Sequence, residues 1–315
     1  MSNWKGIRYL LGILLVLSIW GCSSTDHVEP PKQSLPPKPE PASLILATPL
    51  QVSYQSELAL ARLGQMLSEM ELTKEQRAEL FYERAVVFDR VGLRSLARLD
   101  FTRALREKPD FAEAYNFIGV YLVQQQNYDE AYEAFDSALE LAPDYDYAYL
   151  NRGIALYYGN RPDLAASDIK RFFEAEPEDP YRVLWLFLAE AKLDADQAKR
   201  NMRERYEKYH DSSWNWDLVR LYLGDLTPTQ LMGNVIKGVK ENRDLAERLC
   251  ETYFYLGKLE LAKGNRKEAI SYFKLALANN VYDFIEHRYA LLELDLMSRK
   301  RQNSTDVSAK KQASI

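Results

Sequence analysis

The chain has 315 residues, of which 47% are hydrophobic, so it is long enough to form one large domain or two ordinary ones. Its formal net charge of -5 is modest and acidic, which argues against a role in nucleic-acid binding. Cys22 and Cys250 are its two cysteines, too few and too far apart for a disulfide framework or a zinc site. Runs rich in Val, Ile and Thr are missing, which favours an all-α fold.

A short basic region precedes an uncharged apolar stretch at the start of the chain. Lys5 and Arg8 are followed by YLLGILLVLSIW at residues 9–20, and then by Gly21 and Cys22. A membrane-spanning helix needs about 20 apolar residues, so this shorter stretch matches the apolar core of a secretory signal instead. We therefore expect residues 1–21 to be a signal peptide.

The end of this segment, LSIWGCSS, resembles the lipobox of bacterial lipoproteins. The usual lipobox has four positions: Leu, then a small residue, then Gly or Ala, and then Cys. Ile19 and Gly21 fit the pattern, whereas Trp20 stands where a small residue is usual. The resemblance implies that Cys22 becomes the acylated N-terminus, held on a bilayer by more than one chain. Ser23 is not the Asp that signals inner-membrane retention, so the outer membrane, facing the periplasm, is implied. The alternatives are an ordinary signal with an incidental cysteine and an uncleaved anchor.

Residues 22–49 are rich in proline and contain few large apolar side chains until their last residues. Such a composition favours an extended chain that cannot bury enough surface to fold. We expect this segment to be a tether between the acylated cysteine and the folded part. A proline-rich ligand for a partner domain is the alternative.

Three prolines set a repeat that begins after a helical segment at residues 50–77. Pro109, Pro143 and Pro177 follow one another at intervals of 34 residues, the length of a tetratricopeptide repeat. We therefore predict three repeats over residues 78–179, each made of two antiparallel helices. Small residues should let the two helices approach closely, and large residues should fill the space beside them. The repeats place small residues at Ala85, Gly119, Gly153, Ala97, Ala131 and Ala165, and large ones at Phe81, Tyr115, Tyr149, Phe101, Phe135 and Ile169. Phe172 stands where alanine is usual, so packing should change after the third repeat.

The later part of the chain reads as further helices. Residues 180–249 suit degenerate helical repeats, residues 250–283 fit a fourth repeat, and residues 284–298 form a capping helix. Thr73 with Gln76 and Thr227 with Gln230 have the spacing of a capping box at a helix start. Trp214 and Trp216 suit the core, or alternatively a partner or dimer surface. The polar residues 299–315 are expected to form a disordered tail. The predicted fold is an α-α superhelix with a C-terminal capping helix.

Side chains suited to catalysis are sparse. Of the three histidines, His27 falls in the tether, His210 at a charged helix end and His287 on the capping helix. Motifs for a zinc protease, a serine hydrolase or a phosphate loop are missing, and Cys250 suits a small buried helix residue. We therefore expect a protein that is not an enzyme and needs no metal or cofactor.

A repeat array of this kind presents a concave face built from the first helix of each repeat. This face is acidic at one end and aromatic at the other, which suits capture of a peptide or protein. The alternative is that later helices cover it and make it core. Free peptide C-termini are poor candidates as ligands, because the basic residues that would bind a carboxylate are missing from this face. The candidate binding residues are Glu79, Tyr82, Asp89, Glu113, Asn116, Tyr147, Tyr157 and Tyr158.

Two longer stretches are similar to one family. NYDEAYEAFDSALELAPDYDYAYLNRGIALYYGNR at residues 127–161 and FIEHRYALLEL at residues 284–294 resemble the NlpI family of outer-membrane lipoproteins, as does the order of the parts. The resemblance implies a homodimer that is not an enzyme. It implies an adaptor that brings a murein endopeptidase to a periplasmic tail-specific protease and gathers other cell-wall enzymes. A structural or assembly lipoprotein of an outer-membrane complex is the alternative.

Overall fold

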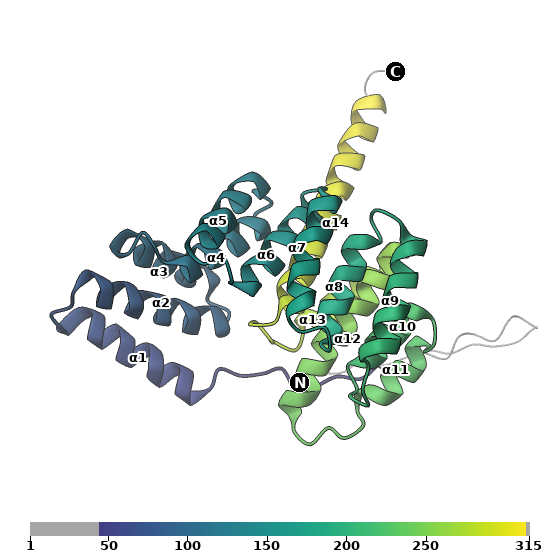
Figure 1. The fold of residues 1–315 in the computed structure, drawn as a ribbon, viewed down its shortest axis with the longest axis horizontal. Coiled ribbons are helices and arrows are strands. Elements are labelled where there is room, and N and C mark those ends of the chain that lie inside the picture. The colour runs from purple at the N-terminus through teal and green to yellow at the C-terminus, as the bar shows by residue number, and fades with distance from the viewer. Residues whose placement is uncertain (1–43, 313–315) are drawn as a thin grey trace, which may run out of the picture. The chain divides into compact units, whose positions relative to one another are not determined.

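Fourteen α-helices and no strands form residues 44–312, the part of the chain that the computed structural model describes (Figure 1). Side chains are placed for residues 44–299. The predicted signal peptide, Cys22 and most of the predicted tether lie outside the described residues. The prediction of an all-α repeat array is confirmed.

The helices follow one another with short turns. The first seven are α1 (Tyr54–Glu69), α2 (Lys74–Arg90), α3 (Arg94–Glu107), α4 (Ala112–Gln124), α5 (Tyr128–Leu141), α6 (Asp146–Tyr158) and α7 (Pro162–Ala175). The middle four are α8 (Pro180–Glu190), α9 (Ala195–Tyr209), α10 (Trp216–Leu223) and α11 (Pro228–Val235). The last three are α12 (Asn242–Ala262), α13 (Arg266–Leu277) and α14 (Ile285–Gln312). The strongest packing joins α2 to α3, α4 to α5, α6 to α7 and α12 to α13, which are the four predicted repeat pairs.

The turn inside each repeat supports the 34-residue frame. Gly92, Gln126, Asn160 and Gly264 have backbone φ angles of 81°, 65°, 60° and 82°, in the left-handed region. Each lies at the same position of its repeat, 14 residues after Ala78, Ala112, Asp146 and Cys250 respectively. The left-handed residue reverses the chain between the two helices, a conformation that glycine adopts freely and asparagine tolerates.

Close approach within the repeats depends on the small residues that the sequence indicated. An added Cβ at Gly119 would lie 2.6 Å from the Phe135 ring, and one at Gly153 would lie 2.5 Å from Ile169 Cγ1. Gly257 has the same relation to Phe273, at 2.7 Å. In the first repeat, Ala85 and Phe101 are both fully buried. The pairing of a small residue on the first helix with a large one on the second is therefore confirmed.

Phe172 stands at the end of the third repeat, where the repeat usually has alanine. Phe172 is buried, and the Arg182 guanidinium lies 3.8 Å from the centre of its ring and donates to its carbonyl oxygen. Both predicted capping boxes are present, at the starts of α2 and α11. Trp216 is buried and contacts Tyr206, so it belongs to the core.

The chain ahead of α1 is attached to the last repeat, although the sequence placed it at the end of the tether. Asn242 binds both the N–H and the carbonyl oxygen of Thr48, at 2.9 and 2.8 Å. The Leu50 N–H donates to the Asn279 carbonyl oxygen, and the Tyr253 hydroxyl donates to that of Ile45. These side-chain partners come from far along the chain, so local composition gave no sign of them.

Helix α14 also differs from its predicted extent. It continues to Gln312, through residues expected to form a disordered tail. Residues 299–312 contain neither proline nor glycine, so nothing in them stops a helix. Its first half packs against α4, α12 and α13 (Figure 1).

The contacts around two glycines predict that one alanine substitution destabilises the fold and that the other stabilises it. Gly153→Ala should destabilise the fold by about 1–3 kcal/mol, because Ile169 and the Ala165 carbonyl leave no space for a methyl group. Gly233→Ala, in α11 with nothing within 4 Å of its Cβ, should instead stabilise by about 0.5–1 kcal/mol. Urea unfolding measures both, and equal effects would contradict the close-packing account.

Candidate functional site

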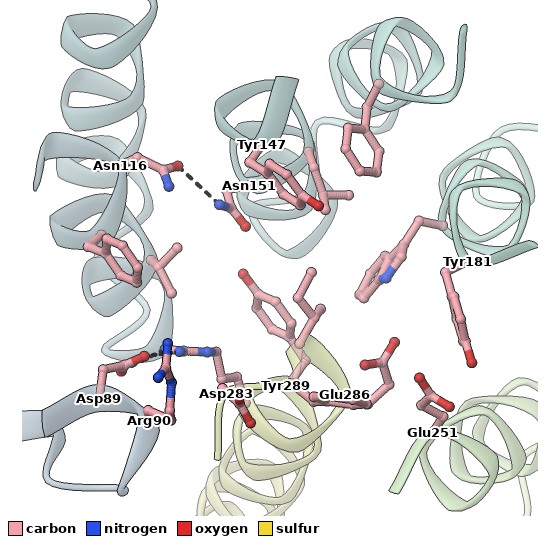
Figure 2. Close-up of a pocket in the computed structure, with 18 of the residues that line it drawn as sticks. Asp89, Arg90, Asn116, Tyr147, Asn151, Tyr181, Glu251, Asp283, Glu286 and Tyr289 are labelled. Atoms are coloured by element: carbon pink, nitrogen blue, oxygen red, sulfur yellow. Dashed lines mark hydrogen bonds and ion pairs between the residues drawn. The ribbon is translucent and has the colours of Figure 1, made fainter. Parts of the chain in front are cut away.

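A pocket of about 520 Å³ lies on the face formed by the first helices of the repeats. Helices α4, α6 and α8 supply one side, and α12 and α14 close the other (Figure 2). The end of α2 adds Asp89 and Arg90. The pocket therefore exists only where the last part of the chain returns to the repeats.

Buried ion pairs hold α14 in this place. Arg288 binds Asp89 through both terminal nitrogens of its guanidinium, and the Tyr121 hydroxyl donates to Asp89 Oδ1 at 2.5 Å. Farther along, Lys258 Nζ lies 2.6 Å from Glu293 Oε1 and 2.9 Å from the Tyr157 hydroxyl. Losing a partner from such a buried pair costs several kcal/mol, so these contacts fix the position of α14 along its axis.

His287 on α14 also contacts the repeats, and it does so as a neutral side chain. Arg94 lies 3.1 Å from His287 Nδ1, so Nδ1 accepts and the proton is on Nε2. Burial, Arg94 and Arg288 lower the pKa of His287 to about 3. His287 is therefore packed in the interior.

Two amides form a polar wall on the repeat side of the pocket. Asn116 Nδ2 donates to the Tyr145 hydroxyl, and Asn151 Nδ2 donates to Asn116 Oδ1 at 3.0 Å (Figure 2). In both bonds an amide nitrogen is the donor, so the chain of bonds runs from Asn151 through Asn116 to Tyr145. It leaves Asn151 Oδ1 without a hydrogen-bond donor among the described residues.

Aromatic rings form the wall between α6 and α8. The Trp185 ring packs edge-on against Tyr289 with centroids 5.7 Å apart, and Tyr147 contacts Phe172 at 5.6 Å. Tyr147 is 55% exposed, which marks the mouth of the pocket, whereas Trp185 is buried at its base. Figure 2 shows the Tyr289 ring directed from α14 toward the middle of the pocket.

The end of the pocket beside α12 is acidic. Glu251 and Glu286 lie near each other there, each against a tyrosine: Tyr181 for Glu251, and Tyr255, whose hydroxyl is 3.2 Å from Glu286 Oε1 (Figure 2). Burial raises the pKa of Glu286 to about 7. Burial, reinforced by Glu286, raises the pKa of Glu251 well above its ordinary value. Burial also raises the pKa of Asp179, at the start of α8.

The pocket gathers three of the eight residues predicted to bind a partner. Asp89, Asn116 and Tyr147 line it. Tyr82 instead lines a neighbouring apolar groove between α1 and α2, and Glu79 and Glu113 are exposed outside both.

The remaining two candidates lie beneath α14. Tyr157 is buried, and its hydroxyl accepts from Lys258. Tyr158 is partly covered, and its hydroxyl donates to Glu293 at 2.9 Å. Later helices therefore cover this end of the concave face, as the alternative interpretation of the sequence expected, while the end at Tyr147 stays open. Binding by any of the eight stays a prediction.

Sequence reasoning did not select the pocket residues that come from α8, α12 and α14. Trp185 lies in the apolar stretch RVLWLFLAEAKL, which was assigned only to a helix. Glu286 and Arg288 interrupt the apolar capping helix, which was a signal that this helix meets buried charges. Their partners could not be identified without the fold.

Within residues 44–312 no helix is both long and apolar enough to cross a bilayer, and no group of three or more His, Cys, Asp or Glu side chains could hold a metal ion. Cys250 is fully buried, as expected, and burial raises the pKa of its thiol well above the ordinary value.

The raised pKa of Glu286 predicts how stability depends on pH. The folded carboxyl holds its proton more tightly than the unfolded one, so its contribution to stability is full below pH 4.5 and is lost as pH rises through about 7. Glu286→Gln should therefore raise the free energy of unfolding at pH 8 by on the order of 2 kcal/mol more than at pH 5. Urea unfolding at both pH values measures this, with Glu79→Gln as the exposed control. A pH-independent difference would contradict the assignment.

The ion pair at Arg288 predicts a large effect from one substitution. Arg288→Met leaves Asp89 buried without its partner and should cost about 3–5 kcal/mol. Arg243→Met breaks an exposed pair with Glu247 and should cost about 0.5 kcal/mol or less. Chemical unfolding compares the two, and similar small effects would show that α14 does not depend on this pair.

Comparisons with known proteins agree with the repeat. The family model described as tetratricopeptide repeat matches residues 82–146. Among solved structures, MamA is 19% identical with a TM-score of 0.43, covering 49% of this chain and 88% of its own. PilF of Pseudomonas aeruginosa is 19% identical with a TM-score of 0.39, covering 76% and 90%. YrrB, a tetratricopeptide protein with an unusual peptide-binding site, is 18% identical with a TM-score of 0.38, covering 68% and 91%. The family model, together with the paired helices of the fold, shows that the chain contains tetratricopeptide repeats.

Proposed function

We propose that this protein is a lipid-anchored adaptor that holds partner proteins together at the outer membrane. The observation that carries the proposal is the pocket at Tyr147, which joins exposed aromatic surface to hydrogen-bonding amides on the face that repeat arrays use for binding. Repeat arrays of this kind are generally scaffolds rather than catalysts. The proposed role needs no cofactor and no catalytic set.

The proposed location rests on the sequence at Cys22. Acylation there would tie the protein to the inner leaflet of the outer membrane, with the repeats in the periplasm. The proline-rich residues that follow would keep the repeats away from the lipid surface. An adaptor acts by position, so the anchor is part of the proposed function.

The proposed partners follow from the resemblance to the NlpI family. They are a periplasmic tail-specific protease and a murein endopeptidase that the protease degrades, with other cell-wall enzymes as further partners. A homodimer would present two pockets to these partners and raise their effective concentration. The biological result would be controlled turnover of a cell-wall hydrolase during growth and division.

A reconstituted degradation assay tests this function. The tail-specific protease and a candidate endopeptidase are incubated with and without the purified full chain, and loss of the endopeptidase is followed over time. The full chain should accelerate degradation at least tenfold, and no acceleration would contradict the adaptor role. Capture of outer-membrane assembly proteins without the protease, from solubilised envelope, would support the assembly alternative instead.

A pair of matched tyrosine variants locates the effect. Tyr147→Ala removes an exposed ring at the mouth of the pocket, and Tyr54→Ala removes an exposed ring on α1 outside it. Both are surface changes, so the fold should tolerate them. Only Tyr147→Ala should slow the assisted degradation, by about three- to tenfold for one aromatic contact of 1 kcal/mol or so. Equal effects would place the binding surface elsewhere.

A further inference from the structure

The pocket holds carboxyl groups that the protein itself does not neutralise. Among the described residues, the buried acids Asp89, Asp100, Asp168 and Glu293 each form an ion pair with an arginine or lysine. Glu251 and Glu286 are equally buried, and no described residue forms an ion pair with either. Both line the pocket. The two buried acids that lack an ion-pair partner are therefore found at one place in the fold.

The nearby cations already have partners. Arg182 binds Glu176 and the Phe172 carbonyl oxygen, and lies 3.7 Å from Asp179. Arg288 is bound to Asp89, and Lys258 to Glu293. Arg90 also lines the pocket, but Figure 2 shows it beside Asp89, at the end away from Glu251 and Glu286. A cation bound between Glu251 and Glu286 would therefore have to come from outside the described fold.

A second group in the pocket also lacks a partner. The Tyr289 hydroxyl has no hydrogen-bond partner, and the residue is only 1% exposed. Figure 2 shows the Tyr289 ring rising from α14 into the pocket, with its hydroxyl directed toward Asn151. A buried hydroxyl without a partner is destabilising, and a ligand carbonyl that accepts its hydrogen would remove that cost. Together with Asn151 Oδ1, it offers the donor and acceptor that an extended main chain needs.

The space between these groups suits a long cationic side chain. Trp185 and Phe172 line the same pocket as the two carboxyls, and aromatic faces favour lysine and arginine over neutral side chains. The methylene stem of such a side chain packs on the rings while its charged end reaches the carboxylates. Guanidinium and carboxylate groups can also form paired, charge-assisted hydrogen bonds.

A second hollow borders the pocket. Val86 lines both the pocket and the apolar groove between α1 and α2, where Leu63, Met66 and Tyr82 lie. An extended chain could therefore place apolar side chains in the groove and a cationic side chain in the pocket. A small free amine would leave the groove unused.

We propose that the pocket binds an extended segment of a partner protein through one lysine or arginine, seated between Glu251 and Glu286, with neighbouring apolar residues in the α1–α2 groove. This deepens the proposed adaptor function and rests on it, because it names the chemistry of the segment that the adaptor recognises. The preference is opposite to recognition of a free C-terminal carboxylate. Charge complementarity is what commits the site to a cationic segment.

The pH dependence of binding follows from the same groups. Glu251 and Glu286 bind a cation when ionised, so affinity should fall as pH decreases from 8 to 5. The other titratable groups facing them are Asp179 and Tyr181 from α8, Glu247 and Tyr255 from α12, and Asp283 ahead of α14. The acids among them are favourable toward a cation, and neither tyrosine ionises in this range.

A positional-scanning peptide library tests the proposal on the full chain. The probes are acetylated and amidated hexapeptides, so that neither terminus supplies a charge. The chain should enrich lysine or arginine at one position, with apolar residues preferred nearby. Enrichment of acidic residues, or no preference at all, would overturn the proposal. Substituting citrulline for the enriched arginine should weaken binding at least tenfold, because it keeps the shape and removes the charge.

Isosteric variants assign the effect to the two carboxyls. Glu251→Gln with Glu286→Gln should weaken the selected peptide at least tenfold and remove the pH dependence, whereas Glu133→Gln, at an exposed position on α5 outside the pocket and the groove, should change neither. Thermal unfolding checks that each variant is folded. Tyr289→Phe tests the other part of the site, because it removes only the hydroxyl that is proposed to bind the main chain of the peptide. Unchanged affinity in the folded double variant would overturn the proposal.

Two outcomes separate this inference from the adaptor function. If the full chain accelerates degradation in the reconstituted assay but the library selects no cation, the adaptor function stands and the cationic site fails. If a peptide of residues 23–43, which contains Lys32 and Lys38, binds with the same dependence on Glu286, the occupant is a segment of this chain and not a partner.

Discussion

The structure depends on the docking of α14 against the first helices of the repeats. Two buried ion pairs, Asp89 with Arg288 and Lys258 with Glu293, join α14 to α2 and α12. Sliding the helix by one turn would leave these charges buried without partners, at several kcal/mol each. Their value is therefore in fixing one position of the helix more than in adding stability. That position creates the pocket, because α14 supplies one side of it and covers the rest of the face.

The same docking explains how a repeat array obtains a site of limited size. An array without a returning helix presents a long open groove that accepts many ligands. Here α14 covers the region of Tyr157 and Tyr158 and leaves the region of Tyr147 open. The returning helix also brings Glu286, a buried carboxyl without an ion-pair partner, and Tyr289, whose hydroxyl has no hydrogen-bond partner. The proposed selectivity would thus arise at a contact between segments far apart in the sequence.

The sequence was most informative where a residue's role is set by its near neighbours. Spacing identified the four repeat pairs, and residue size identified the contacts of Gly153 with Ile169 and of Gly119 with Phe135. Spacing could not show that Asn242 would bind Thr48 or that Arg288 would bind Asp89, because those partners lie 194 and 199 residues apart. The candidate residues were chosen from the repeats alone. The pocket needs Trp185, Glu251 and Tyr289, whose positions are set only by tertiary packing.

The central claim is that partners bind at the open end of the concave face. Site-specific photo-crosslinking in intact cells tests it most directly, with a photoreactive amino acid in place of Tyr147 or, as the control, Tyr54. We predict that position 147 crosslinks to the tail-specific protease or to a cell-wall hydrolase, identified by mass spectrometry, and that position 54 does not. Crosslinks to such an enzyme from position 54 but not from position 147 would contradict the account.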